Sequence, residues 1–400
     1  MEEEFDIGDI LADTYIPISH LEEERIAKAY RISSYICLGI MPPIIICNIM
    51  IFCGMTLYPG FYTSINVLLM NLAIADFLMG IFGLPFYVLS SLPLTKDYVF
   101  SHKYTCLTRF ASMVLCAGGS LYSLMFISLD RYFAIMWPLH YYSKIGVSCT
   151  VHCMQVFWLY IVVLAFIPLL GYNQYDDKVM PLSERCSFTN VLPLAYILWI
   201  VVVVALGCIV TSLILNIRIA CTIRNKRKRR SSISLPRRNS TLNVFLRVSN
   251  IHITIVLMFL FIILWLPFLA VSLIKSLKII NPVDMEIAYC SAMLISFINS
   301  LVNAPVYAFF RMEYREVYKI MLTSLPWHWR KELRDLHRRT HAMFHCTLED
   351  YMSCVECPEH TIDNQEEIIR HGSSVDRHEC LHTISFEDIE QKQLSDETSQ

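Results

Sequence analysis

Five polar residues interrupt the long apolar runs of this chain at positions where their chemistry needs an explanation. Asp76 lies in NLAIADFLMG and Ser120 in a later run, while Asn299, Ser300 and Asn303 lie together in the last run. A carboxylate in apolar surroundings costs free energy unless hydrogen bonds or a cation compensate for it. One carboxylate with several neutral oxygens suits a hard monovalent cation. The structural alternative is a hydrogen-bonded cluster in which Asp76 is protonated.

A second polar group stands at the end of the third apolar run, in SLDRYFAIMWPLHY. Asp130 is adjacent there to Arg131, whose five donors suit a side chain that switches between alternative partners. Two later runs contain a proline, Pro267 or Pro305, which removes a backbone hydrogen bond and bends its helix. These residues suggest bent helices and an exchangeable ion pair.

The elements that position these residues are long apolar helices. Hydrophobic residues make up 55% and charged residues 17% of the 400 residues, so the chain is more apolar than soluble domains are. A helix needs about 20 apolar residues to cross the hydrocarbon layer. Runs of about this length predict seven spans, at 34–57, 64–92, 107–129, 151–170, 191–220, 252–274 and 287–310. The predicted fold is all-α, a seven-transmembrane helix bundle.

The charge pattern indicates how the bundle lies in the membrane. The densest basic run, RNKRKRRSSISLPRRNS, lies between the fifth and sixth spans. Lys and Arg concentrate on the cytoplasmic side, so this loop is predicted to be cytoplasmic and the N-terminus extracellular. A basic run between two spans does not indicate nucleic-acid binding. The first 30 residues lack an apolar signal-peptide core, so we expect no cleaved signal.

The sequence divides into four parts. We predict an extracellular segment at 1–30, the bundle at 31–310, a short amphipathic eighth helix at 311–322, and a polar, mostly disordered cytoplasmic tail at 323–400. The tail contains CVEC and several histidines, which is a weak zinc pattern. Cysteines inside the spans act as small hydrophobes. Cys106 and Cys186 lie on the oxidising side and are predicted to form a disulfide.

A series of sequence markers follows the seven spans in order. They are Asn48; Asp76 in LAIAD; Cys106; Asp130-Arg131-Tyr132 with Pro138-Leu139; Trp158; Cys186; Phe261, Trp265 and Pro267; and Asn299-Ser300, Asn303 and Tyr307. In this order they resemble the rhodopsin-like (class A) family of G-protein-coupled receptors over residues 30 to 322. The resemblance implies a receptor in the plasma membrane, with no enzymatic activity and no cofactor apart from an allosteric sodium ion.

The resemblance also implies roles for individual residues. The implied sodium site consists of Asp76, Ser120, Asn299, Ser300 and Asn303. Arg131 would pair with Asp130 at rest and turn toward a heterotrimeric G protein on activation, and Trp265 would report ligand occupancy to the bend at Pro267. The implied coupling and switch residues are Asp130, Arg131, Tyr132, Pro138, Leu139, Phe261, Trp265, Pro267, Asn303, Pro305 and Tyr307.

Three features depart from the family pattern. Arg247 stands where many members have a carboxylate that restrains Arg131, which predicts some ligand-independent activity. The fifth span offers Cys208 and Asn216 in place of the usual proline and tyrosine, although Asn216 could still form a hydrogen bond near Arg131. Pro305 is one place later than usual, so the bend turns by about 100° around the helix.

Helical spacing from the markers predicts which residues face the ligand. They are Arg109, Met113, Val114, Ala117, Phe188, Trp265, Phe268, Leu269, Ser272, Ser296 and Phe297. Amine receptors need a carboxylate at the position of Met113, which disfavours an amine. Loop sequences such as PLLGYN resemble the adenosine, cannabinoid, melanocortin and fatty-amide receptors. Adenosine recognition uses an acid, an Asn and a His at the positions of Thr189, Ser272 and Phe297, which disfavours adenosine.

What remains is an apolar, aromatic site with one cation, Arg109, which suits the polar head of an amphipathic lipid. Arg109 could instead pair only with loop acids such as Asp176, Asp177 or Glu184. A peptide-type or nucleoside-type receptor is an alternative. A scaffold or scavenger that binds without coupling is another, because Asn216, Arg247 and Pro305 depart from the pattern.

Other interactions are expected on the cytoplasmic side. Basic residues precede Ser232 and Ser240, which are predicted phosphorylation sites. Receptor kinases and arrestin are expected partners of the tail. A transporter would favour internal repeats, and we find none in the sequence.

Overall fold

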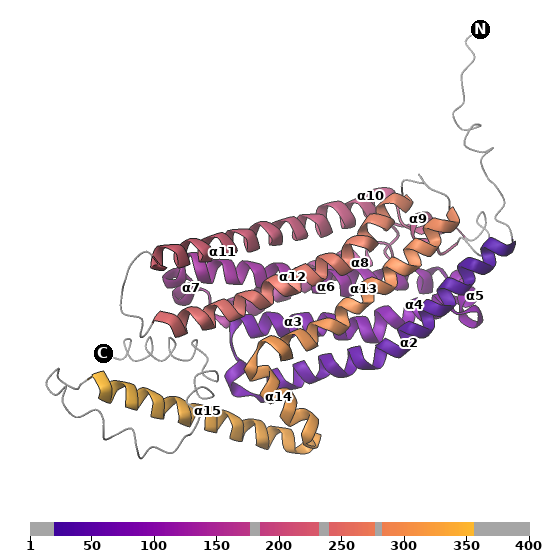
Figure 1. Cartoon of the computed structure of the whole chain (residues 1–400). Coiled ribbons are helices and arrows are strands. Elements are labelled where there is room, and N and C mark those ends of the chain that lie inside the picture. Colours follow the sequence, from indigo (N-terminus) through magenta and orange to yellow (C-terminus); the bar gives the residue numbers. More distant parts are fainter. Residues whose placement is uncertain (1–19, 177–184, 232–239, 277–281, 356–400) are drawn as a thin grey trace, which may run out of the picture.

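The computed structural model describes residues 20–176, 185–231, 240–276 and 282–355, without the side chains of 229–253 and of some other helix positions (Figure 1). All regular elements in these ranges are helices, and seven are long and apolar enough to span a membrane. The spans are α2 (His20–Leu57), α3 with α4 (Ser64–Leu78, Leu84–Ser91), α6 (Lys103–Met136), α8 (Val147–Phe166), α10 with α11 (Leu194–Leu198, Gly207–Ser231), α12 (Ser240–Ser276) and α13 (Pro282–Phe310). The predicted seven-span helix bundle is confirmed.

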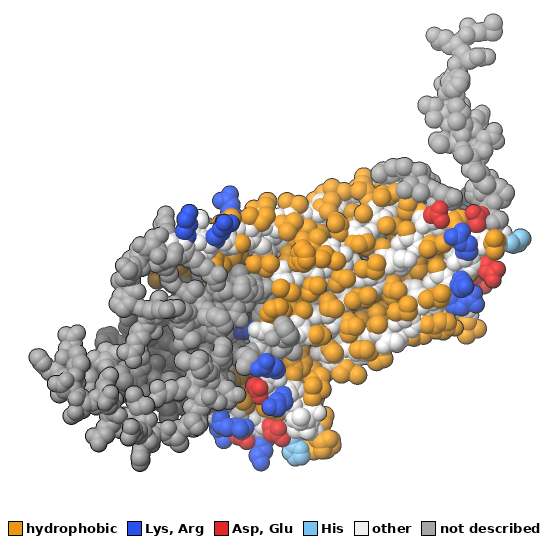
Figure 2. All heavy atoms as spheres, viewed as in Figure 1, with side chains coloured by type: hydrophobic (Ala, Val, Ile, Leu, Met, Phe, Trp, Pro, Cys, Tyr) orange, Lys and Arg blue, Asp and Glu red, His pale blue; other side chains and the backbone are white. Residues whose placement is uncertain are grey.

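The spans are held together by buried faces and present apolar side chains outward. Helix α6 packs against α3, α8 and α11, and α13 packs against α2 and α12. Figure 2 shows hydrophobic side chains across the visible middle of the bundle, a region called the hydrophobic belt below, with Lys, Arg, Asp and Glu at its two ends. Helices satisfy their own backbone hydrogen bonds, which is why they can expose such a belt to lipid.

Several spans deviate from regular α-helix without ending. Pro267 lies inside α12 and Pro305 inside α13, and both helices continue beyond the proline. The fifth span lacks a proline but contains a π-helical turn, Trp199–Leu206, immediately before α11. A π-turn shifts the register of the side chains that follow it. The fifth span is therefore made irregular by this π-helical turn, where the fourth-residue hydrogen bonds of the α-helix are replaced, and not by a proline.

Short elements connect the spans at both ends of the bundle. At one end lie α5 (Pro93–Ser101) and α9 (Phe188–Val191), and a disulfide joins Cys106 to Cys186 there, as the sequence predicted. At the other end lie α7 (Pro138–Lys144) and α14 (Met312–Thr323). Helix α14 corresponds to the eighth helix predicted at 311–322.

Two of the four predicted parts of the chain contain helix where none was predicted. Helix α2 begins at His20, inside the predicted segment 1–30, because Leu, Glu, Lys, Arg and Ala at 21–29 are good helix formers. Helix α15 (Pro326–Val355) forms within the tail that was predicted to be mostly disordered. Its physical reason is local burial, since the side chain of Leu333 is 0% exposed against the rest of the protein. Residues 356–400 lie outside the described residues.

Candidate functional site

Asp76 is the centre of a buried polar cluster between α3, α6 and α13. Its side chain is fully buried and accepts hydrogen bonds from Ser120 Oγ at 2.9 Å, Ser300 Oγ at 2.8 Å and Asn303 Nδ2 at 2.7 Å. The structure thus brings four of the five predicted sodium ligands together. Three donors compensate in part for the loss of water around the carboxylate.

The same region contains buried oxygen atoms that have no donor among the described residues. They are Oδ1 of Asn299, Oδ1 of Asn303 and the hydroxyl of Tyr307. Buried acceptors are normally satisfied, and each exception needs an explanation. Neutral oxygens near a carboxylate are the donor set of a hard monovalent cation. These residues fit a sodium ion, and bound water molecules would satisfy the same atoms.

Neighbouring amides tie this cluster to the other spans. Asn48 of α2 donates to the backbone carbonyl of Ser300 at 3.1 Å. Trp158 of α8 donates to Asn71 Oδ1 at 2.6 Å, and Asn71 donates to Ser123 of α6 at 2.7 Å. The sequence markers Asn48 and Trp158 therefore act here as structural clamps between helices.

At one end of α6 the buried guanidinium of Arg131 pairs with Asp130. Arg131 Nε and Nη2 donate to Asp130 Oδ2 at 2.9 and 2.5 Å, and Tyr141 of α7 donates to Asp130 Oδ1 at 2.5 Å. Both oxygens of Asp130 are thus engaged, one of them by a residue that the sequence prediction omitted. The arrangement holds Arg131 along its own helix.

Three of the other predicted coupling residues, Tyr132, Pro138 and Leu139, lie close to this pair along the chain. Leu139, which follows Pro138 at the start of α7, is 89% exposed and projects from the protein. Tyr132 packs edge-on against Trp137 at 5.7 Å. Asn216 of α11 donates to Ser128 at 3.0 Å, one turn before Arg131. Ser232 lies outside the described residues, and the side chains of Ser240 and Arg247 are not described.

A continuous chain of aromatic rings runs from the disulfide-bonded loop into the bundle. Phe188 lies 6.2 Å from Tyr289, Tyr289 lies 5.6 Å from Phe268, and Phe268 lies 5.8 Å from Trp265, measured between ring centroids. Trp265 stacks on Phe261 at 5.7 Å. The chain therefore joins predicted ligand residues to predicted switch residues, through Tyr289, which the sequence prediction missed.

Arg109 lies beside the loop end of this chain. Its side chain is only 6% exposed, and its guanidinium lies 5.1 Å from the ring centroid of Phe110, which in turn lies 5.8 Å from Phe188. No residue that the structure describes forms a hydrogen bond or an ion pair with Arg109. Buried charges are normally paired, and Asp177 and Glu184, two of the loop acids predicted as alternative partners of Arg109, lie outside the described residues.

The remaining predicted ligand residues divide into two groups. Met113 and Leu269 are buried, and Val114 and Ala117 are partly buried, as expected for a lining. Ser272 is fully buried and its hydroxyl has no partner among the described residues. Ser296 and Phe297 are engaged elsewhere: Ser296 donates to the carbonyl of Met293, and Phe297 packs edge-on against Tyr87 at 5.2 Å.

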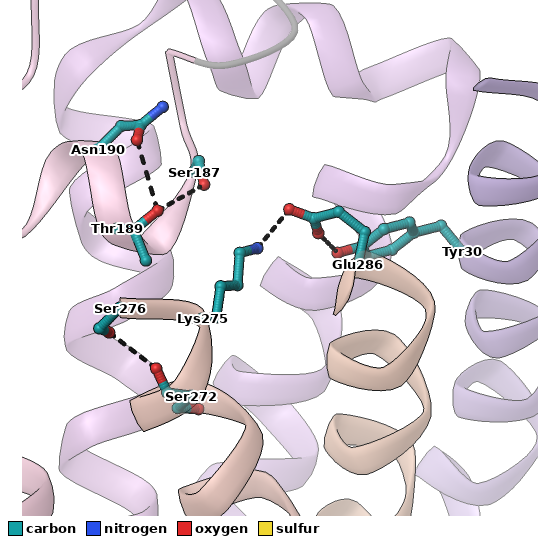
Figure 3. A network of polar contacts seen from close by, with 8 residues as sticks. All are labelled: Tyr30, Ser187, Thr189, Asn190, Ser272, Lys275, Ser276 and Glu286. Carbon is teal, nitrogen blue, oxygen red and sulfur yellow. Dashed lines mark hydrogen bonds and ion pairs between the residues drawn. The ribbon is translucent and has the colours of Figure 1, made fainter. Parts of the chain in front are cut away.

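A polar network that the sequence prediction missed closes the same end of the bundle. In Figure 3, Lys275 of α12 and Tyr30 of α2 point toward Glu286 of α13. Lys275 forms an ion pair with Glu286, and the hydroxyl of Tyr30 donates to Glu286 at 2.9 Å. The Lys275 ammonium also lies 4.5 Å from the ring centroid of Tyr289. The network links three helices above the aromatic chain.

A sequence signal for part of this network existed. Glu286 and Tyr289 are three residues apart in MEIAYC, so they share one face of the last span. A carboxylate within a membrane span is costly unless another group pairs with it, so Glu286 predicts a partner of positive charge. The identity of that partner, Lys275, depends on how two helices pack, and this spacing does not contain that information.

The comparisons with known proteins agree with this geometry. The sequence model described as the 7 transmembrane receptor (rhodopsin family) matches residues 47–307. Adenosine receptor A2b of Homo sapiens is 27% identical over 269 residues, which cover 63% of this chain and 78% of that receptor. Adenosine receptor A3 of Bos taurus is 24% identical over 308 residues, 75% and 91% of the two chains. The chain therefore belongs to the rhodopsin family of seven-transmembrane receptors and is a multi-pass membrane protein, not an enzyme.

Proposed function

We propose that this receptor lies in the plasma membrane with its N-terminus outside, binds a small amphipathic ligand within the bundle, and activates heterotrimeric G proteins. The observation that carries the ligand proposal is Arg109, a buried cation with no partner among the described residues, beside a chain of aromatic rings. The rings suit an apolar body, and Arg109 suits a carboxylate or phosphate head. A lipid with such a head is the best candidate.

Signal transfer is proposed to follow the aromatic chain. A ligand against Phe268 would change the packing of Trp265, which lies two residues before the proline bend of α12. Movement at the bend would displace the end of α12 near Arg131, which would then exchange Asp130 for the G protein. The exposed side chain of Leu139 would contact the G protein nearby. Receptor kinases and arrestin are proposed to act on residues outside the described ranges.

A sodium ion at Asp76 is proposed to favour the resting state. The support is the set of buried oxygens without donors, on Asn299, Asn303 and Tyr307. The ion would be held by Asp76 with the neutral oxygens of neighbouring residues and would neutralise the carboxylate. The residues themselves keep α3, α6 and α13 together through the hydrogen bonds to Asp76.

A nucleoside is the second candidate ligand, because adenosine receptors are similar to this chain over most of their length. Against it, Thr189, Ser272 and Phe297 replace the three polar groups expected for adenosine. Phe297 is also fully buried, with its ring packed edge-on against Tyr87. Adenosine is therefore included in the test as a comparison ligand, with no response expected.

The test screens lipids, peptides and adenosine in cells that carry a panel of G-protein reporters. Arg109→Ala should raise the half-maximal concentration of an anionic lipid roughly 10- to 150-fold, the value of a hydrogen bond to a charged group. Lys103→Ala, which removes an exposed cation at the start of the same helix, is the matched control. An active ligand that is unaffected by Arg109→Ala contradicts the binding proposal.

Coupling itself is tested with purified protein. Ligand-stimulated nucleotide exchange on G proteins should be lost in Arg131→Ala at unchanged ligand binding. Binding without exchange in the wild-type receptor, under every ligand tried, would show a scaffold or scavenger instead.

Basal signalling no higher than in mock-transfected cells, at equal surface expression, would contradict the ligand-independent activity expected from Arg247.

A further inference from the structure

Helix α15 begins beside the bundle, at the end that carries Arg131. Figure 1 shows α15 starting at the far end of α14 and running away past this end of the bundle. Its first half contacts α14, the end of α2 and the short turn Pro59–Phe61. The start of the helix is therefore attached to the membrane-spanning part.

The attached face of α15 is apolar and well fixed. Trp329, Leu333 and Leu336 follow the i, i+4, i+7 spacing of one helix face, and Leu333 is fully buried. Trp329 Nε1 donates to the backbone carbonyl of Ser324 at 3.1 Å. The ring of His337 meets the ring of Tyr58 edge-on at 5.5 Å. These contacts set the rotation of α15 about its axis.

The opposite side of this region combines exposed apolar residues with cations. Leu322, Leu325 and Trp327 are exposed at the turn between α14 and α15, Trp327 by 72%. Arg330, Lys331 and Arg334 follow within the next two turns and are exposed as well. The sequence order is thus apolar first and basic second. Figure 2 shows Lys and Arg side chains, with Asp and Glu among them, just beyond the edge of the hydrophobic belt.

We propose that residues 322–334 form a docking surface for anionic phospholipid. Leu322, Leu325 and Trp327 are exposed apolar side chains, and tryptophan favours the membrane–water interface. Arg334 follows Trp327 by seven residues, about 10 Å along the helix, so its long side chain reaches lipid phosphates while Trp327 remains at the interface. Three cations against one acid, Glu332, make this segment positive and so match the charge of such lipids, and each cation near the surface strengthens attachment about five-fold.

This surface goes beyond ligand binding and G-protein coupling. An anionic lipid bound here holds α15 in place next to the Arg131 end, and so makes the position of the tail helix depend on lipid composition. Arg338 and Arg339 lie farther along α15, about 16 to 18 Å from Trp327, and are too distant to share the same lipid phosphates. They provide a control with the same change of charge, and one of them, Arg338, also pairs with Asp335 at 3.6 Å.

The experiment uses the full chain in nanodiscs, and it is independent of topology because a disc presents the same lipids on both faces. Hydrogen exchange of backbone amides in 326–340 is measured by mass spectrometry in phosphatidylcholine discs and in discs that also contain phosphatidylserine. Exchange should slow at least about five-fold with phosphatidylserine, and raised salt should abolish the difference. Arg330→Glu with Lys331→Glu should remove it, while Arg338→Glu with Arg339→Glu should retain most of it.

Equal exchange in the two kinds of disc overturns the proposal, as does an equal loss in both double variants. Slow exchange that requires added G protein also overturns it, because the surface would then belong to a protein partner. If Arg330→Glu with Lys331→Glu already exchanges rapidly in phosphatidylcholine discs, α15 is unfolded in that variant. The salt dependence of the wild-type protein then decides, and lipid-induced protection that persists at high salt refutes an electrostatic docking surface.

Discussion

Two buried arginines lie on the same helix, α6, about 33 Å apart, and their surroundings differ in one respect. Arg131 is 7% exposed and pairs with Asp130, whose second oxygen is held by Tyr141. Arg109 is 6% exposed and has no anionic partner among the residues that the structure describes. Buried charges are normally paired. One end of the helix is therefore held by an ion pair within the protein, and the proposed ligand anion would supply the missing partner at the other end.

Replacing each arginine by methionine gives the largest effect expected from this comparison. Arg131→Met leaves Asp130 buried with one partner fewer, and breaking a buried pair costs about 3–5 kcal/mol of unfolding free energy. Arg109→Met leaves no described group without its partner, so stability should be unchanged or higher. Unfolding of the purified, ligand-free protein in one type of nanodisc measures both. Equal losses would mean that Arg109 has a stabilising partner after all.

Tyr141 tests the ion pair of Arg131 with Asp130 without removing a charge. Tyr141→Phe deletes one hydrogen bond to the carboxylate of Asp130, which is worth about 1.5–3 kcal/mol. Because Asp130 then holds Arg131 less firmly, basal nucleotide exchange should rise, by roughly tenfold for 1.4 kcal/mol of the lost energy. Tyr62→Phe, in an exposed loop at the same end, should change nothing. Unaltered basal exchange in Tyr141→Phe would show that Tyr141 only supports the loop.

The Asp76 cluster contacts α6 at Ser120, between Arg109 and Arg131. The proposed sodium ion at Asp76 gives a third buried charge whose partner can be tested. Replacing choline by sodium at constant ionic strength should stabilise the receptor by about 1.4 kcal/mol when sodium reaches ten times its dissociation constant. Asp76→Asn should abolish this increment, and Asn299→Ala should reduce it by removing a neutral oxygen. The same sodium effect in Asp76→Asn would place the ion elsewhere. No sodium effect in the wild type would leave bound water as the occupant.

The sequence predicts those structural features that depend on a local pattern of residues. Apolar run lengths predict the seven spans, and the pairing of Arg131 with Asp130 joins neighbours in the sequence. The disulfide between Cys106 and Cys186 was predicted because both lie on one side of the membrane. Packing between distant segments was predicted where the family resemblance implied it, as for Asp76 with Ser120, Ser300 and Asn303. Other contacts that depend on how two elements pack were missed. Tyr141 reaches Asp130 only because α7 folds back under α6.

The tail illustrates the same limit in another way. Its composition is polar, which predicts disorder, and yet α15 forms because Leu333 and Trp329 find an apolar surface on the bundle. The surface consists of residues such as Tyr58, almost three hundred positions earlier in the chain. A local sequence window contains the apolar residues of the helix but not the surface that receives them.

The smallest expected effect concerns the network at the Arg109 end. The side chains of Lys275 and Glu286 are 11% and 28% exposed, so water screens this ion pair more than the pair of Arg131 with Asp130, and Glu286→Gln should cost less unfolding free energy than the about 3–5 kcal/mol expected there. Glu286→Gln should lower the half-maximal concentration of an anionic ligand, whereas Arg109→Ala should raise it. Losing the carboxylate leaves Lys275 positive beside Tyr289, and the added positive potential favours an anionic head.

An anionic lipid should therefore act at a lower concentration on Glu286→Gln, by up to about fivefold for 1 kcal/mol, and the gain should shrink as salt is raised. Tyr30→Phe is the control, because it removes the neutral partner of Glu286 and leaves the charges unchanged. A loss of potency in Glu286→Gln as large as in Arg109→Ala would mean that Glu286 itself binds the ligand. The Arg109 end would then bind a ligand that carries both a cation and an anion. Arg109 would pair with the anion of that ligand and Glu286 with its cation, whereas Arg131 is paired within the protein.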